Sequence, residues 1–187
     1  MAAGHEIEIK FRVKDVKPLG AALLSAGFRL ATERTHEMNT LYDLPSGTLR
    51  ARGALLRLRR YGDLWTLTFK DRSTTQGRHK SRREIETRVE NGPAMAELLE
   101  ALGYRPSFAY EKFRSEWTDR TGHVVVDETP IGNFGEIEGP PEWIDAIAGT
   151  LGITAGQYIT ASYAELFMEW KQQSRSPASN MLFASLA

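Results

Sequence analysis

The residues in this chain whose types and spacing could do chemistry are charged pairs that would share one face of a β-strand. Three pairs are acidic and two are basic: Glu6 with Glu8, Glu84 with Glu86, Glu136 with Glu138, Arg57 with Arg59, and Lys112 with Arg114. Side chains two positions apart point to the same side of a strand. Carboxylates bind hard divalent cations, and lysine and arginine bind phosphate oxygens. A metal-bound polyphosphate would satisfy both kinds of pair.

Single charges extend both sets. Lys10 continues the face of Glu6 and Glu8, Lys70 ends the stretch LWTLTFK, and Asp127 follows the apolar run 124–126. A solvated strand face usually mixes both signs, because like charges repel across strands. Here the signs are grouped by strand, which favours a concave charged face that holds an ionic ligand. An exposed, salt-bridged sheet face is the alternative that the residues alone leave open.

The composition narrows the choice of metal and partner. The chain has 187 residues, 41% of them hydrophobic, which is enough for one domain with a core. It has no cysteine, so the expected cofactor is a hard cation, Mg²⁺ or Mn²⁺. Basic and acidic residues balance at 24 each, so nucleic acid is an unlikely partner. No apolar run reaches the roughly 18 residues of a membrane span, and a cytoplasmic location is expected.

Strands and helices alternate irregularly along the chain. Strands are predicted over 6–13, 36–43, 54–62, 64–71, 82–90, 110–122, 123–130 and 134–139. Helices are predicted in DVKPLGAALLSAGF, in GPAMAELLEALGY, over 141–149, and from Thr160 or Ser162 through ITASYAELFMEWKQQ, where Tyr163, Phe167 and Trp170 are expected to pack in the core. Short turns join most of the strands. This pattern favours an α+β fold with an antiparallel sheet or barrel.

In their order, the motifs resemble the CYTH domain of the triphosphate tunnel metalloenzymes. The resemblance covers about residues 5–170 and is carried by Glu6-x-Glu8-x-Lys10, NTLYD (39–43), LLRLRR (55–60), LTFK (67–70), REIE (83–86), EKFR (111–114) and VDETPIGNFGEIEG (126–139). It implies an eight-stranded antiparallel β-barrel with flanking helices, whose interior is a triphosphate tunnel. A single domain is expected over residues 1–174, with a flexible C-terminal tail over 175–187.

The resemblance also implies a role for each charged residue. The metal ligands would be Glu6, Glu8, Asp127, Glu136 and Glu138. The triphosphate would be bound by Lys10, Arg57, Arg59, Lys70, Lys112 and Arg114. Glu6, Glu8 and Lys10 would be catalytic, with Lys10 orienting or activating the nucleophile. Glu84 and Glu86 would be tunnel acids of less defined role.

Two reactions fit such a tunnel. Hydrolysis of inorganic triphosphate, or of an organic or nucleoside triphosphate, is preferred because it needs only the shared core. The alternative is a class IV adenylyl cyclase, which converts ATP to cyclic AMP and pyrophosphate and needs a pocket for adenine and ribose that no stretch identifies.

A third hypothesis involves no turnover. A binding module for polyphosphate or RNA 5′-triphosphate would use the basic stretch RSTTQGRHKSRR (72–83), although such a run is usually a solvated hairpin loop. In each case the expected partner is a small-molecule triphosphate or a related polyanion, and the protein would be a monomer or a homodimer.

Overall fold

The computed structural model describes residues 4–76 and 79–186, and its centre is an antiparallel sheet rolled into a barrel. The strands are β1 (Gly4–Val13), β2 (Arg29–Asp43), β3 (Leu55–Tyr61), β4 (Leu64–Lys70), β5 (Thr74–Gln76), β6 (His79–Val89), β7 (Arg105–Thr118), β8 (His123–Thr129) and β9 (Gly132–Glu138). They lie in the order β1-β9-β8-β7-β2-β3-β4-β6-β5. Pairing of β1 with β6 closes a ring of eight strands, and the short β5 adds to β6. The predicted α+β fold with an eight-stranded barrel is confirmed.

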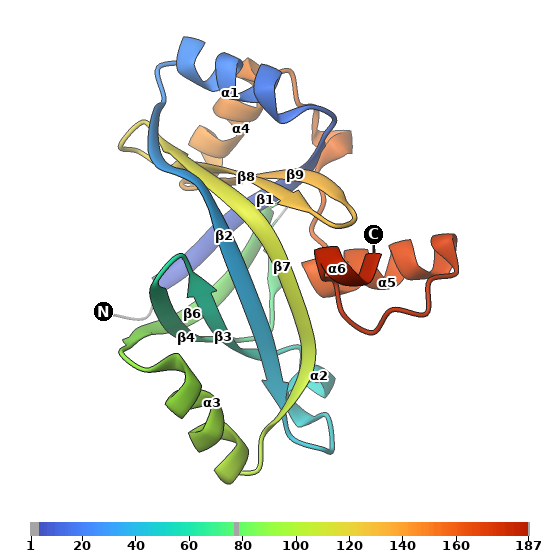
Figure 1. Ribbon diagram of the computed structural model, residues 1–187. Helices are drawn as coiled ribbons and strands as arrows, with labels where there is room; N and C mark the ends of the chain where they lie inside the picture. The colour runs from blue at the N-terminus through green and yellow to red at the C-terminus, as the bar shows by residue number, and fades with distance from the viewer. Residues whose placement is uncertain (1–3, 77–78, 187) are drawn as a thin grey trace.

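The helices cover the outside of the barrel in three groups (Figure 1). The first group, α1 (Val16–Ser25) and α4 (Pro141–Thr150), lies at one end, and α3 (Gly92–Ala101) lies at the other. The third group, α5 (Tyr163–Ser174) and α6 (Phe183–Leu186), lies beside β7. Two short elements, α2 (Thr48–Ala51) and a 3-10 helix (Ala155–Gln157), complete the set. Nowhere in the described part of the chain is a helix both long and apolar enough to cross a membrane.

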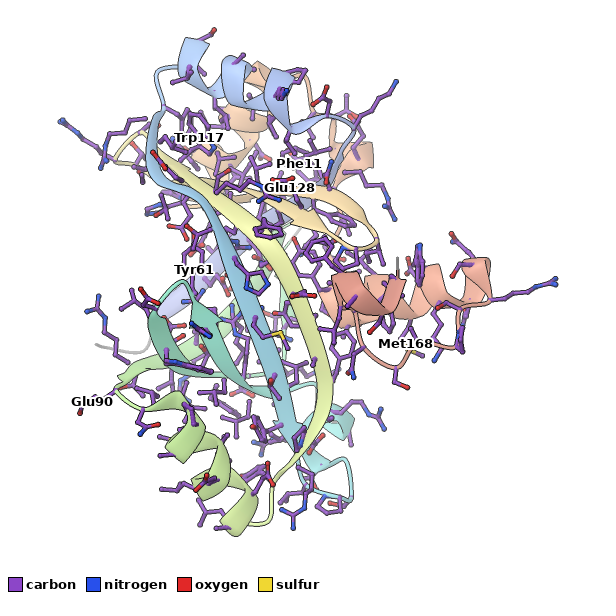
Figure 2. All side chains as sticks on the ribbon, in the orientation of Figure 1. Phe11, Tyr61, Glu90, Trp117, Glu128 and Met168 are labelled. Carbon is purple, nitrogen blue, oxygen red and sulfur yellow. The ribbon has the colours of Figure 1, made fainter. Side chains whose placement is uncertain are left out.

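The alternation along the strands separates a dry outer layer from a charged interior. In β1, Ile9 and Phe11 are buried in a cluster with Leu23 of α1 and Ile144 of α4. Figure 2 shows Phe11 and Trp117 at the end of the barrel that α1 and α4 cover, and both belong to this cluster. The intervening charged side chains then point into the barrel, where they form ion pairs with one another.

Local sequence signals set the helix ends as predicted. The Asp15 side chain accepts a hydrogen bond from the Lys17 amide at the start of α1, and Gly27, with φ of +87°, follows its end. A capping box of Ser162 with Glu165 begins α5, which decides between the two predicted starts.

Three strands differ in extent from the prediction. β2 begins at Arg29, before the expected residue 36. The prediction missed the first half of this strand because that half is largely exposed and carries no apolar alternation. β6 begins at His79, before the expected residue 82. With β5, it makes eight residues of the basic stretch 72–83 strand; residues 77–78 lie outside the described residues. β7 runs from Arg105 to Thr118, ending before the expected residue 122.

The C-terminal segment lies along β7. Met181 is fully buried and bridges to Tyr110, with its amide donating to the Ala109 carbonyl at 3.0 Å. The Ala109 amide donates to the Asn180 side chain at 2.8 Å, and the Phe183 ring lies 5.5 Å from that of Phe113. These contacts order a segment that was expected to be a flexible tail; its mobility in solution stays a prediction.

Candidate active site

The barrel encloses a cavity of about 380 Å³ that is lined mainly by charged side chains. Every predicted site residue except Asp127 contributes to this lining: Glu6, Glu8, Lys10, Arg57, Arg59, Lys70, Glu84, Glu86, Lys112, Arg114, Glu136 and Glu138. Strand pairing therefore gathers residues from both ends of the chain around one space. We call this space the tunnel.

The first and last acidic pairs meet where β1 pairs with β9. Glu8 is the register partner of Glu138, and Lys10 is the register partner of Glu136. Burial, together with the charges of Glu6 and Glu8, raises the pKa of Glu138 to about 8. A carboxyl group resists ionisation in this way when its neighbours already carry negative charge. At Glu138, the negative charges of Glu6 and Glu8 therefore outweigh the positive charge of the nearby Lys70.

Lysines hold two of these acids. Lys70 forms ion pairs with Glu6 and, at 2.8 Å, with Glu84, while Lys80 donates to Glu8 at 3.0 Å. As they stand, no three histidine or acidic side chains within residues 4–76 and 79–186 are grouped closely enough to hold a metal ion. The donor set nevertheless fits a hard divalent cation, because it offers only carboxylate oxygens and its Glu138 is disfavoured as a free anion.

Lys10 is held as a cation. Its Nζ lies 2.9 Å from Glu136 Oε1 and donates to the Ala161 carbonyl at 3.4 Å. Burial by itself lowers the pKa of Lys10, but Glu136 and Glu8 outweigh this effect and raise it above the ordinary value. The ammonium therefore persists at neutral pH. Two roles were predicted for Lys10, orienting the nucleophile and activating it. A charged ammonium can donate a hydrogen bond but cannot accept a proton, so the orienting role is favoured.

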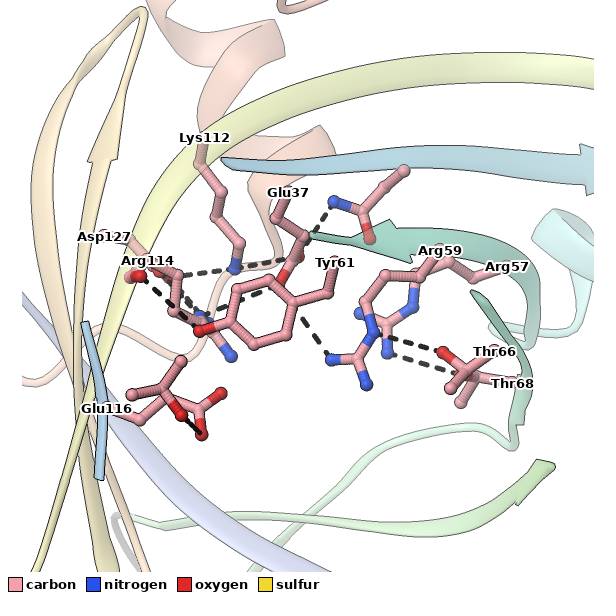
Figure 3. A network of polar contacts seen from close by, with 12 residues as sticks. Glu37, Arg57, Arg59, Tyr61, Thr66, Thr68, Lys112, Arg114, Glu116 and Asp127 are labelled. Atoms are coloured by element: carbon pink, nitrogen blue, oxygen red, sulfur yellow. Dashed lines mark hydrogen bonds and ion pairs between the residues drawn. The ribbon is translucent and has the colours of Figure 1, made fainter. Parts of the chain in front are cut away.

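Asp127 lies behind the cations and does not line the cavity (Figure 3). It is fully buried, and its two oxygens accept from Arg114 at 2.7 and 2.6 Å, from Lys112 at 2.9 Å and from the Tyr163 hydroxyl at 2.6 Å. Both oxygens of Asp127 are hydrogen-bonded, and Asp127 holds Lys112 and Arg114 from the side that faces away from the cavity. Its predicted metal role stays a prediction.

Sequence reasoning missed several residues that line the tunnel. Tyr163 is buried in a core cluster, as expected, but its ring also lines the tunnel, with its centroid 4.6 Å from Lys10 Nζ and 4.8 Å from Lys112 Nζ. Lys80 and Arg82 also line the tunnel. Their signal was present, because the two-residue spacing of Glu84 and Glu86 continues back through them on the same strand.

A larger cavity of about 1210 Å³ adjoins the tunnel, between the end of β2 and α5. Both cavities are lined by Leu55, Lys80, Arg82 and Ser162, so they meet at this point. Apolar side chains such as Phe108 and several arginines contribute to the larger cavity, which we call the outer cavity. Its mixed lining differs from the charged lining of the tunnel.

A closed antiparallel barrel with both signs of charge turned inward defines a class of proteins that bind small polyanions inside the barrel. The chain belongs to the CYTH domain family, whose model matches residues 4–172. The predicted resemblance is thereby confirmed. Members of this family are adenylate cyclases or triphosphatases, bind triphosphate substrates and generally depend on a divalent metal.

Individual relatives are distant but cover most of the chain. The adenylate cyclase CyaB of Aeromonas hydrophila is 27% identical, over 86% of this chain and 87% of the relative. A candidate adenylate cyclase from Vibrio parahaemolyticus has a solved structure with a TM-score of 0.77, 21% identity, and coverage of 89% of this chain and 99% of that one. The Hippeastrum protein HpAC1, a candidate adenylyl cyclase described as having a dominant triphosphatase activity, gives a TM-score of 0.64 at 22% identity, covering 88% and 95% of the two chains. The structural likenesses establish the fold.

Proposed function

We propose that this protein is a divalent-metal-dependent triphosphatase that hydrolyses inorganic triphosphate or an organic triphosphate in the tunnel. The observation that carries this proposal is the lining of the tunnel. Fifteen of the 21 residues that line the space of about 380 Å³ are charged, and the apolar or aromatic remainder includes Leu55, Val125, Tyr110 and Tyr163. Such a space suits a phosphate chain, because its lining is predominantly charged, whereas a nucleobase is usually bound by a predominantly apolar and aromatic lining.

The cations would bind the phosphate oxygens from the two strands that flank β2. Arg57 and Arg59 come from β3, whereas Lys112 and Arg114 come from β7. Phosphoryl transfer requires mainly positioning and charge neutralisation, and a guanidinium can bind two oxygens at once. The attacking water would bond to the terminal phosphorus while the bridging P–O bond breaks, releasing orthophosphate and, from inorganic triphosphate, pyrophosphate.

Two groups of residues would direct this reaction. The permanently charged Lys10 would orient the terminal phosphate or the water through a field that need not reorganise. Glu6, Glu8 and Glu138, with Glu136 beside them, would hold Mg²⁺ or Mn²⁺. The bound cation would supply a Lewis acid that offsets phosphate charge. The remaining acids, Glu84 and Glu86, pair with Lys70 and Arg59 and would fix their positions.

An adenylyl cyclase is the second candidate, and the outer cavity is the observation that favours it. Its volume of about 1210 Å³ and its mixed lining could hold adenine and ribose next to a triphosphate in the tunnel. The Aeromonas relative is named an adenylate cyclase. In this reaction the ribose 3′-hydroxyl would attack the α-phosphorus and release pyrophosphate.

A product assay separates these candidates. Purified protein is incubated with inorganic triphosphate, ATP or thiamine triphosphate, each with Mg²⁺ or Mn²⁺, and orthophosphate, pyrophosphate and cyclic AMP are quantified. We expect orthophosphate release that disappears in Glu6→Gln. Cyclic AMP with an equal amount of pyrophosphate would instead identify a cyclase, and binding of triphosphate without any product would identify a binding module.

A further inference from the structure

Glu37 lies on the strand between the two strands that carry Arg57, Arg59, Lys112 and Arg114, although no charge pair in the sequence pointed to it. Its strand, β2, lies between β3 and β7 in the sheet, and these two neighbours supply the four arginine and lysine side chains named above. In the register, Glu37 is opposite Lys112 on β7 and Tyr61 on β3. Its side chain is fully buried. Figure 3 shows it between Lys112 on one side and Arg59 on the other.

The two oxygens of Glu37 have different surroundings. Oε1 accepts a hydrogen bond from Asn39 Nδ2 at 2.9 Å and lies 3.4 Å from Lys112 Nζ. Oε2 lies 4.0 Å from a nitrogen of Arg59 and 4.0 Å from Nε of Arg114. It has no hydrogen-bond partner within the described residues. A buried carboxylate oxygen is rarely left in this state, because its desolvation is costly.

The position of Oε2 accounts for this arrangement. It lies 4.0 Å from a nitrogen of each of two guanidinium groups, one on β3 and one on β7, so it attracts both and accepts a hydrogen bond from neither. The Nε–H of Arg114 already donates to Asp127, so Nη1 of Arg59 is the group near Oε2 whose hydrogens a ligand in the tunnel could use. Asp127 contrasts with this, because it binds Arg114 by two hydrogen bonds of 2.6 and 2.7 Å.

The charge on Glu37 also offsets the repulsion between the cations of β3 and β7. Arg57, Arg59, Lys112 and Arg114 are like charges around one space and would repel one another. Burial by itself raises the pKa of Glu37, but Lys112 and Arg114 outweigh it and hold the pKa well below the ordinary value. Glu37 therefore remains an anion beneath the cations.

We propose that Glu37 is a positioning residue that holds Arg59, Lys112 and Arg114 at the separation at which they receive a triphosphate chain together. This inference rests on the proposed function only for the identity of the ligand. Its specific consequence concerns chain length. A triphosphate offers more oxygens than orthophosphate and can contact more of these cations at once, so we expect the loss of Glu37 to weaken the first ligand more than the second.

Binding tests this without turnover. Calorimetric titration of the full-length protein in EDTA with inorganic triphosphate, and separately with orthophosphate, would compare wild type with Glu37→Gln. We expect the triphosphate affinity to fall about 10- to 100-fold, the range found at metal sites when a group that orients a ligand-binding side chain is removed. The orthophosphate affinity should stay unchanged or rise, because a negative charge has been removed. Glu33→Gln, an exposed glutamate on the same strand, is the matched control and should change neither.

Two further variants keep the test decisive if Glu37→Gln folds poorly. Glu37→Asp retains the charge on a shorter side chain, and Asn39→Ala removes the amide that fixes Oε1 while retaining every charge. Each should weaken triphosphate binding by a smaller factor, with full binding stoichiometry. A fall in stoichiometry with an unchanged dissociation constant would show a purely structural role and overturn the inference, as would equal losses for both ligands.

Kinetics would separate this inference from the proposed function. If wild type releases orthophosphate, Glu37→Gln should lose chain-length selectivity and turnover together. If wild type binds triphosphate but forms no product, the proposed function fails, while the binding comparison still decides the role of Glu37. Triphosphate binding to Glu37→Gln as tight as to wild type would overturn the inference in either case.

Discussion

The cations of the tunnel are mostly paired with carboxylates, and this pairing determines what single substitutions should do. Lys10 pairs with Glu136, and Lys112 pairs with Asp127 and Glu37. Removing one partner of a buried ion pair leaves an uncompensated charge, which costs more than the pair itself contributes. At the scale of the residue, stability and ligand binding are therefore coupled through the same side chains.

The pH dependence of stability should report on Glu37. Its pKa is lower in the folded protein than in the unfolded chain, so the ionised group stabilises the fold above its unfolded pKa of about 4.3. This contribution declines as the pH falls toward the lower folded pKa. We expect Glu37→Gln to lose about 3–5 kcal/mol of unfolding free energy near neutral pH.

Urea unfolding of wild type and Glu37→Gln between about pH 7 and pH 3 measures this difference. The difference in unfolding free energy between wild type and Glu37→Gln should be constant down to about pH 5. Below that pH it should shrink by up to about 1.4 kcal/mol per pH unit. Comparing the two proteins cancels the titration of groups that they share. A gap that keeps its full size at the acid end would contradict the prediction.

The cluster of Glu6, Glu8 and Glu138 should make stability depend on divalent metal. A ligand present at about 100 times its dissociation constant stabilises by about 2.7 kcal/mol, which corresponds to roughly 5–10 °C in Tm for a chain of this size. We expect Mg²⁺ or Mn²⁺ to raise the Tm of wild type by this order, and EDTA to reverse the rise. Glu138→Gln should unfold in EDTA at the wild-type temperature or above it and should show no rise with metal. An equal rise in both proteins would place the cation elsewhere.

At the scale of the element, one glycine permits the β1–β9 pairing that forms the acidic corner. Gly135 is the register partner of Phe11, and a Cβ at Gly135 would lie 2.2 Å from Cζ of the Phe11 ring. The ring therefore occupies the space that any side chain at Gly135 would need. The next residue, Glu136, depends on the same close pairing to stand opposite Lys10.

Gly135→Ala should therefore destabilise the protein. Forcing a methyl group into this contact should cost about 1–3 kcal/mol, as overpacking does elsewhere, and should lower turnover by displacing Glu136. Gly149→Ala in α4 is the control, because its Cβ would meet nothing within 4 Å, and we expect a gain of about 0.5–1 kcal/mol. Chemical denaturation of the two variants measures the contrast. Equal stability would show that Phe11 can move aside without cost.

At the scale of the whole molecule, the barrel is closed by contacts between distant parts of the chain. β1 from the N-terminal end pairs with both β6 and β9. The C-terminal segment adds outer contacts to β7 through the buried Met181. The family model ends at residue 172, so this addition lies beyond the matched domain.

Truncation after Ser174 tests whether this segment supports the barrel. It would uncover Tyr110 and remove the side chain of Met181, and we expect a loss of about 2–5 kcal/mol of unfolding free energy. Met181→Leu, which conserves volume, should cost less than about 1.5 kcal/mol. Unfolding curves of the two variants decide the matter. Unchanged stability after truncation would instead support the flexible tail predicted from the sequence.

The sequence alone was sufficient for the features that depend on local pattern. Period-2 alternation identified most of the strand residues and the inward face of β1. Successive side chains along a strand point alternately to the apolar layer under the helices and to the charged inside of the barrel. Capping residues limited the start of α5 to Thr160 or Ser162, and the structure shows Ser162. The ordered motifs identified the CYTH family, and all but one of the predicted site residues line one cavity.

Only the tertiary structure decided how these charges meet. Asp127 resembled a cavity ligand in the sequence, but the pairing of β7 with β8 sets it opposite Arg114 and buries it. Glu37 and Tyr163 carried no charge-pair signal, yet they lie among the cations because β2 and α5 are brought there by strand order and helix packing. Such placements depend on contacts between residues distant in the chain, and a local pattern contains no information about which strands become neighbours.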